Sequence, residues 1–403
     1  MQPRIELIPE KTHSHLSKSS MHVLIRIHAP SLPHNPTRVP LNLALVLDRS
    51  GSMGGAKLEY AKAAAKYVME RLQKEDRVSL VTFDDRVEIP LPNSAAHNLN
   101  LTKVLNAIED RGSTNLHGGW LEGGTQVASK LQPGALNRVL LLSDGMANVG
   151  ITNTDSIATD VRGLASRGIS TSTFGVGRDF DEDMMQSLAQ AGDGNYYFIE
   201  HPNDLPRIFA AELTGLNNTF AQTVSLGLET DNGVKVLDVL NDLSRNEHGR
   251  LMLPNLMFGS MLEVLVKLHL PAGQSLEALR VRLAYIPANG SQRTVTRETL
   301  NIASVDDATY RSLNAHPDVL EALALFEVAR AKVEMIQKLD QGDDNAVKDL
   351  LQTQAATLAA APASARVRKE QVALEELKAD FGKDRAVTRK KAGSQAYEKQ
   401  RGY

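Results

Sequence analysis

Strand-like and helix-like patterns of apolar residues alternate between residues 41 and about 213. Leu43 to Leu47 form a continuous apolar run, which is typical of a strand covered on both faces. Residues 57–74 instead carry apolar side chains at helical spacing. Further strands are predicted at 77–83, 138–143, 169–176 and 196–199, with helices at 100–110, 117–131, 155–167, 181–191 and 203–214. This alternation predicts an α/β fold with a doubly wound, mostly parallel sheet, and residues 86–91 add a short antiparallel edge.

A different pattern lies on both sides of this region. Residues 22–28 alternate as in a β-strand, and six strand-like runs follow between 221 and 302 without an intervening helix. These runs predict an antiparallel β-sandwich. We expect the strand at 22–28 to join it, so that the α/β region is an insertion, and the proline-spaced segment 30–40 to be an extended connector.

Helical patterns return from about residue 305. One apolar face runs from Val319 to Ile336, residues 341–344 break it, and further helices are predicted at 346–360 and 368–380. Residues 381–403 carry seven Lys and Arg against two acidic residues, about +5. We interpret this end as a solvated, partly disordered tail, with a docking tail for an acidic partner or nucleic acid as the alternative. The predicted domains are 1–40, 41–214, 215–304, 305–380 and the tail 381–403.

Composition narrows the classes of function. The 403 residues contain no cysteine, which excludes disulfides, thiolate zinc sites, iron–sulfur clusters and cysteine nucleophiles. The formal net charge of −3 argues against a broad nucleic-acid footprint. The first residues lack the apolar core of a signal peptide, and no apolar run approaches the ~20 residues of a membrane span. We therefore expect a cytoplasmic protein.

Oxygen-bearing side chains follow the first predicted strand of the α/β region. Asp48, Ser50 and Ser52 alternate in the run Asp-Arg-Ser-Gly-Ser, and hard divalent cations prefer oxygen ligands of this kind. Thr114 precedes the helix predicted at 117, and Asp144 ends another buried strand. Ligands of a doubly wound sheet bind beyond the carboxyl ends of the strands, where the strand order reverses. We expect these five side chains to meet there around one ion.

The predicted ligand set also suggests what the ion would do. Three neutral hydroxyls and at most two carboxylates do not exceed the charge of a divalent ion. They leave the ion an open position, which attracts a carboxylate from outside. The amino terminus of the helix near residue 57 favours such an anion.

Simpler interpretations exist for each residue. Asp48, Ser50 and Ser52 can form a polar turn, Asp144 can belong to a strand-end turn, and Thr114 can be a helix-entry hydroxyl. The acidic residues between 179 and 183 fit a helix-capping run, with a second cation site as the alternative.

On these residues, the segment from about 41 to 214 resembles a von Willebrand factor A (VWA) domain with a complete metal-ion-dependent adhesion site (MIDAS). Met53, residues 112–116 and the run from Ser143 to Gly150 resemble the bacterial form. The resemblance implies that Asp48, Ser50, Ser52, Thr114 and Asp144 hold Mg²⁺, with Mn²⁺ or Ca²⁺ as alternatives. It further implies that a protein partner supplies a Glu or Asp to the ion. The flanking β segments resemble bacterial relatives of inter-alpha-trypsin inhibitor heavy chains and of calcium-activated chloride channel regulators.

We therefore predict a non-catalytic, metal-dependent protein-binding adaptor. Bacterial proteins of this family often act beside AAA+ ATPases, so the resemblance implies such an assembly as one setting. A metal-assisted hydrolase is an alternative, because an ion with an open position can activate water, but no general base is evident beside the motif. A membrane-linked channel-type regulator is a third possibility.

Overall fold

The computed structural model describes residues 1–17, 19–33, 38–97, 101–132, 134–273, 276–290 and 292–402. It divides into two compact units. We call residues 32–223 with 286–292 the α/β unit, and residues 1–31, 224–285 and 293–403 the flanking unit. The flanking unit thus contains chain from both sides of the α/β unit, as an insertion requires. Residues 34–37 of the predicted connector lie outside the described residues.

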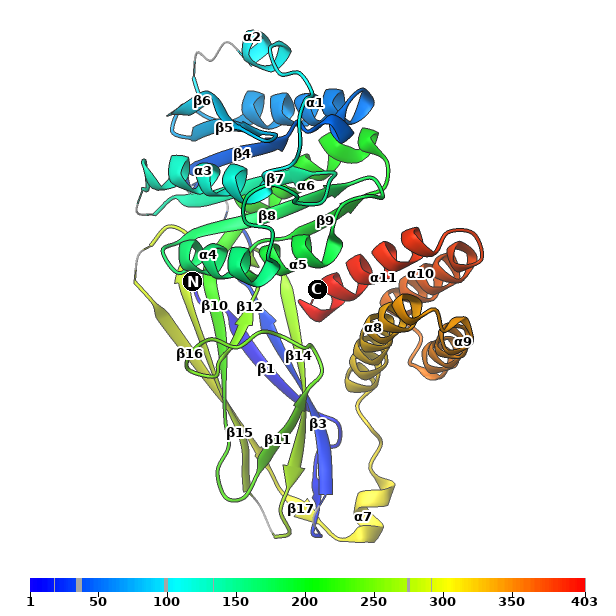
Figure 1. Ribbon diagram of the computed structural model, residues 1–403. Helices are drawn as coiled ribbons and strands as arrows, with labels where there is room; N and C mark the ends of the chain where they lie inside the picture. The colour runs from blue at the N-terminus through cyan, green and yellow to red at the C-terminus, as the bar shows by residue number, and fades with distance from the viewer. Residues whose placement is uncertain are drawn as a thin grey trace. The chain divides into compact units, whose positions relative to one another are not determined.

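The α/β unit is built on a mixed sheet (Figure 1). Its strand order is β6 (Val87–Ala95), β5 (Arg77–Phe83), β4 (Leu41–Asp48), β7 (Leu136–Ser143), β8 (Ile169–Val176) and β9 (Tyr196–Ile199). All neighbours pair in parallel except the edge strand β6, which is antiparallel to β5. The chain runs from β4 to β5 on one side and later to β7 on the other, so the strand order reverses between β4 and β7. These findings confirm the predicted α/β class.

Helices cover both faces of this sheet because the apolar residues of β4 point to both sides. Leu43, Leu45 and Leu47 share a core with α1 (Ala56–Arg71) and α6 (Leu205–Asn217). Val46 lies on the other face, against Gly123 of α3 (Leu116–Ala128). The remaining helices are α2 (Leu101–Asn106), α4 (Thr154–Ala165) and α5 (Glu182–Ala191), with the short turn η2 (Pro202–Asp204) before α6.

A buried ion pair joins α6 to the sheet. Arg138 Nη1 of β7 donates to Glu212 Oε1 of α6 at 2.7 Å, and the two side chains are 4% and 2% exposed. Ser172, Asn195 and Tyr197 also donate to the Glu212 carboxylate. Burial by itself raises the pKa of Glu212, but Arg138 and these donors outweigh it, so the pKa lies below its ordinary value.

Antiparallel sheets form the β part of the chain, as the alternating pattern predicts. One sheet has the order β1 (Arg4–Pro9), β3 (Ser19–His28), β14 (Met261–Leu270) and β11 (Lys235–Val239). Val23 of β3 pairs with Val266 of β14, so the strand predicted at 22–28 does join the later strands. The other sheet contains β12 (Leu251–Leu253), β10 (Thr219–Glu229), β15 (Leu276–Pro287) and β16 (Thr294–Ile302), with β13 (Leu256–Met257) beside β10. Two short strands, β2 (Ser14–His15) and β17 (Ser304–Val305), pair in parallel. The packing of the sheets into a sandwich stays a prediction.

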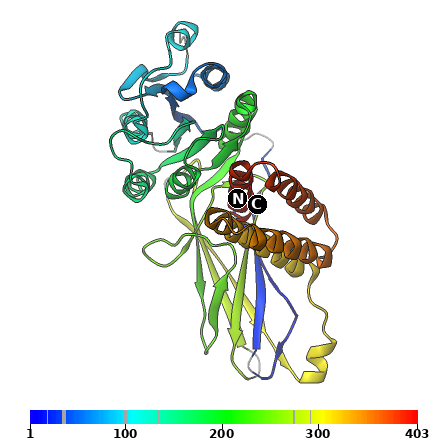
Figure 2. The ribbon, with the colours of Figure 1, turned by 45° about the vertical axis from the view of Figure 1, so that its right-hand side comes forward.

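The C-terminal part is helical. It contains α7 (Asp307–Ser312), α8 (Pro317–Gln341), α9 (Asp344–Ala360), α10 (Ala365–Phe381) and α11 (Arg385–Gln400). Gly342 ends α8 in the left-handed conformation with φ +75°, and the Asp343 carboxylate caps α9, which confirms the predicted break at 341–344. The helices α8 to α11 contact one another, as the brown to red ribbons of Figure 2 show.

The interpretation of residues 381–403 as a solvated tail is wrong for most of the segment. Helix α11 buries Val387, Ala392 and Ala396, and it packs along α8. Its basic residues are balanced by acidic residues of other helices: Arg389 bonds Asp340 of α8 at 2.8 Å, and Lys391 bonds Asp380 at the end of α10 at 2.9 Å. The local surplus of positive charge is therefore neutralised by tertiary contacts.

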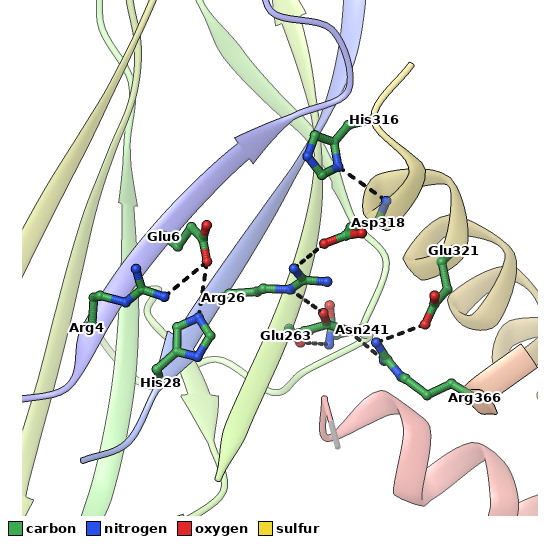
Figure 3. A network of polar contacts seen from close by, with 10 residues as sticks. All are labelled: Arg4, Glu6, Arg26, His28, Asn241, Glu263, His316, Asp318, Glu321 and Arg366. Carbon is green, nitrogen blue, oxygen red and sulfur yellow. Dashed lines mark hydrogen bonds and ion pairs between the residues drawn. The ribbon is translucent and has the colours of Figure 1, made fainter. Parts of the chain in front are cut away.

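Glu263 of β14 joins the sheet to these helices (Figure 3). Its carboxylate is 1% exposed and accepts from Arg26 of β3 at 2.7 Å and from Arg366 of α10 at 2.6 Å. Arg26 also bonds Asp318 of α8, and the Glu263 N–H donates to the Gly402 carbonyl. Two strands and the C-terminal helices thus share one buried carboxylate. None of the helices in the described part of the chain combines the length and apolarity needed to cross a bilayer.

Candidate metal centre

The predicted ligands come together at the carboxyl ends of β4 and β7. Asp48 is the last residue of β4 and is fully buried, and Asp144 directly follows β7 and is also fully buried. The parallel register pairs Leu47 with Leu142, which brings the two strand ends side by side. Ser50 and Ser52 lie in the loop after β4, where residues 51–53 form the turn η1 (Gly51–Met53).

Hydrogen bonds connect these side chains. Asp48 Oδ1 accepts from the Ser50 N–H at 2.8 Å, and Oδ2 accepts from the Ser143 hydroxyl at 2.5 Å. The Ser52 hydroxyl donates to Asp144 Oδ1 at 2.8 Å, and its oxygen lies 3.1 Å from that of Ser50. The two carboxylates are therefore linked to the serine hydroxyls from both strand ends.

Thr114 brings the third segment to the same place. Its N–H donates to Asn148 Oδ1 at 2.8 Å, which ties it to the loop after β7, and the neighbouring Gly112 carbonyl accepts from the Gly51 N–H at 3.1 Å. A Cβ atom built on Gly145 would lie 3.2 Å from Thr114 Oγ1 and 3.5 Å from Ser52 Oγ. The Thr114 and Ser52 hydroxyls thus both lie close to Gly145, the residue after Asp144, so the three segments meet there.

Arg49 holds the loop after β4 in place. Arg49 Nε donates to the buried carboxylate of Asp84, just after β5, at 2.7 Å, and Arg111 donates to the same oxygen at 2.8 Å. Burial raises the pKa of Asp84, but the Arg86 N–H and both arginines outweigh it, so the pKa lies below the ordinary value. Through Arg49, Asp84 anchors the loop from Asp48 to Ser52.

Lys57, in the first turn of α1, is a further residue at this centre that the sequence pattern does not reveal. Its ammonium forms an ion pair with Asp144 Oδ2. A lysine in a helix is ordinarily a solvated side chain, so the only available signal is its position one turn beyond the serine loop.

The electrostatics of the centre favour a bound cation. Burial raises the pKa of Asp48 to about 6, and the negative charge of Asp144 adds to this rise, while hydrogen bonds from Ser143 and Ser50 oppose it. Two neighbouring buried carboxylates are costly without a compensating positive charge. The Lys57 ammonium supplies such a charge to Asp144, and a divalent ion would supply it to both carboxylates.

The donor set fits a hard divalent ion. It offers two carboxylates and three hydroxyls, all oxygen ligands as Mg²⁺, Mn²⁺ and Ca²⁺ prefer. Within the described residues, no group of three or more His, Cys, Asp or Glu side chains is arranged to hold a metal. The candidate centre is not a group of that type, because three of its five predicted ligands are hydroxyl-bearing residues. The assignment of the five residues as ligands stays a prediction.

The acidic run after β8 has a structural role. Asp181 Oδ1 accepts from the Met184 N–H at 2.9 Å and caps α5. This contact agrees with the helix-capping interpretation. A second cation site there stays a prediction.

Known proteins resemble both the α/β unit and the whole fold. YfbK of Escherichia coli is 33% identical over 192 residues, which is 47% of this chain and 33% of YfbK. Human inter-alpha-trypsin inhibitor heavy chain H3 is 27% identical over 202 residues, or 48% of this chain and 22% of the relative. This chain therefore spans a third or less of the length of these two relatives. A von Willebrand factor type A structure from Catenulispora acidiphila has a TM-score of 0.75 at 15% identity, with 93% of this chain and 89% of that chain covered.

These likenesses confirm the predicted resemblance of the α/β unit to a VWA domain and the α/β fold class, while the complete MIDAS stays a prediction. The sequence profile of the von Willebrand factor type A domain matches residues 42–211. That range begins in β4 and ends in α6, and it includes every residue of the candidate centre. Domains of this type typically mediate protein–protein interactions. Residues 42–211 of this chain are a von Willebrand factor type A domain.

Proposed function

We propose that this chain is a non-catalytic adaptor that captures a protein partner through a divalent ion held by Asp48, Ser50, Ser52, Thr114 and Asp144. One observation carries the proposal: two buried carboxylates and three hydroxyls from three separate segments converge beyond the ends of β4 and β7. The preferred ion is Mg²⁺, with Mn²⁺ or Ca²⁺ as alternatives.

Each residue has a defined part in this proposal. Asp48 and Asp144 balance the charge of the ion, and the three hydroxyls contribute oxygen without further charge. When bound, the ion would offer an open coordination position to a carboxylate. The Arg49–Asp84 pair holds the serine loop, so that the hydroxyls are oriented before the partner arrives.

The contacts of both carboxylates favour binding over hydrolysis. A metal-assisted hydrolase needs a general base beside the ion. Asp48 accepts hydrogen bonds on both oxygens, and Asp144 contacts Ser52 with one oxygen and Lys57 with the other. In the proposal both carboxylates are ligands of the ion, so neither serves as the general base. A partner in an AAA+ ATPase-linked assembly is part of the same proposal and is suggested by the family alone.

Calorimetric titration of the full chain with Mg²⁺ and Mn²⁺ tests the metal site. We expect uptake of one ion by the native chain and loss of uptake in Asp48→Ala and Thr114→Ala. Ser113→Ala is the matched control, because Ser113 is the exposed neighbour of Thr114. An absence of uptake by the native chain, or equal uptake by all variants, would contradict the proposal.

Capture of acidic peptides tests the binding role. In Mg²⁺, the immobilised native chain should retain those members of a peptide library that contain Glu or Asp, and it should release them when chelator is added. The Asp48→Ala variant should retain none of them. Retention that is the same in Mg²⁺, in chelator and in the variant would rule out metal-dependent capture.

A further inference from the structure

Lys57 already places a positive charge on one of the candidate ligands. Its ammonium contacts Asp144 Oδ2, while Asp144 Oδ1 accepts from Ser52. Asp144 has no exposed surface, whereas the Lys57 side chain is 25% exposed. The lysine therefore reaches from the surface of α1 to a carboxylate that solvent does not reach.

The surroundings give the lysine side chain room to lie there. A Cβ atom built on Gly177, which follows β8, would lie 3.4 Å from Lys57 Cε and 3.5 Å from Nζ. Gly177 has φ +80°, a conformation that favours glycine. The lysine stem thus passes over a position that carries no side chain, between the ends of β7 and β8.

A buried carboxylate needs a partner of opposite charge. Either an ammonium or a divalent ion can supply this opposite charge. The single negative charge of Asp144 cannot pair fully with both at once. Lysine is well suited to leave, because its charge is compact, strongly hydrated and carried on a flexible four-carbon stem.

We propose that Lys57 is a tethered competitor of the divalent ion for Asp144, so that its departure to solvent accompanies metal binding and its presence weakens metal affinity. This inference rests on the proposed function, since it concerns the same site. It assigns to Lys57 the control of how much free metal the adaptor needs before it can bind a partner.

The competition gives two effects of opposite sign. In Lys57→Met, which keeps the length of the side chain and removes the charge, Mg²⁺ should bind roughly three- to tenfold more tightly. In chelator, the same variant should melt at a lower temperature than the native chain, because Asp144 then lacks its cation. A purely structural lysine would lower the melting temperature without tightening metal binding.

Calorimetric titration with Mg²⁺ and Mn²⁺, together with thermal melts in chelator and in saturating Mg²⁺, measures both effects. Lys57→Arg keeps the charge and should stay within about twofold of the native affinity. Lys62→Met is the matched control, because Lys62 lies on the same helix and pairs with Glu59 at 3.0 Å, away from the centre. Lys57→Gln replaces Lys57→Met if the latter does not fold.

Each outcome decides between the two proposals. Metal binding that is tighter in Lys57→Met than in the native chain supports the competition. If the native chain binds the ion and Lys57→Met binds it equally or more weakly, the competition is overturned and the proposed function stands. If neither binds an ion, both are overturned.

Discussion

Gly145 lies against two candidate ligands, and one methyl group there tests the geometry of the centre. In Gly145→Ala, the new Cβ would approach Thr114 Oγ1 at 3.2 Å and Ser52 Oγ at 3.5 Å. We expect the hydroxyls to be displaced and Mg²⁺ affinity to fall, with a change in the free energy of unfolding below about 1 kcal/mol, because only flexible hydroxyls must move. Titration calorimetry and chemical denaturation measure the two quantities. Unchanged metal affinity would show that these hydroxyls do not bind the ion.

The lowered pKa of Glu212 should make the free energy of unfolding depend on pH. Its pKa lies below the ordinary value of 4.5, so its contribution is fully present above that pH and is lost as the pH falls through the lowered value. Glu212→Gln leaves Arg138 buried without its carboxylate and should cost about 3–5 kcal/mol at pH 7. Denaturation between pH 3 and 7 should show a smaller loss of stability in the variant than in the native chain. Parallel pH profiles would contradict this role.

Some residues of the centre could be predicted from the sequence, and others could not. Asp48, Ser50, Ser52, Thr114 and Asp144 could be proposed because they follow strand ends or precede a helix, and strand order brings such positions together. Lys57, Arg49 and Asp84 could not. Their roles depend on which distant charge each long side chain reaches, and a charged residue after a strand or in a helix is ordinarily solvated.

Among the elements, α3 packs on the sheet through glycines. A Cβ on Gly123 would lie 2.3 Å from Val46 Cγ2, and one on Gly119 would lie 2.4 Å from Phe83. We expect Gly123→Ala to destabilise the α/β unit by about 1–3 kcal/mol through overpacking. Gly163→Ala in α4 is the control, because nothing lies within 4 Å of that position, and it should stabilise by about 0.5–1 kcal/mol through helix propensity. Equal effects in chemical denaturation would mean that α3 can shift away from the sheet at little cost.

Periodicity explains why the elements of the α/β unit could be predicted and α11 could not. The strands β4 and β7 contain continuous apolar runs, Leu43 to Leu47 and Val139 to Leu142, and α1 has a clear apolar face. Helix α11 buries small and polar residues alongside Val387 and Tyr397, and it pairs basic residues with α8 and α10. Its sequence therefore has a weak apolar pattern and a strong charge pattern, and only tertiary structure shows what balances the charge.

At the scale of the molecule, Glu263 is expected to hold the C-terminal helices on the antiparallel sheet. Glu263→Gln removes the charge that Arg26 and Arg366 share and should destabilise the flanking unit by about 2–4 kcal/mol, less than for a wholly buried pair because both arginines are partly exposed. Hydrogen exchange over residues 317–402 should become faster. Glu6→Gln is the control on the same sheet, since Glu6 is 40% exposed beside Arg4 and His28 (Figure 3). Equal exchange in both variants would contradict this role.

The pairing of Val23 with Val266 also constrains how the protein is made. During translation, β1 and β3 leave the ribosome before the von Willebrand factor type A domain and can pair with each other, but β14 follows only after that whole domain has been synthesised. Contacts between such distant segments form slowly, whereas each parallel neighbour of β4 lies closer along the chain. The domain that carries the candidate centre can therefore complete its sheet on the nascent chain while β3 still has an open edge, a state in which chaperone protection is most valuable.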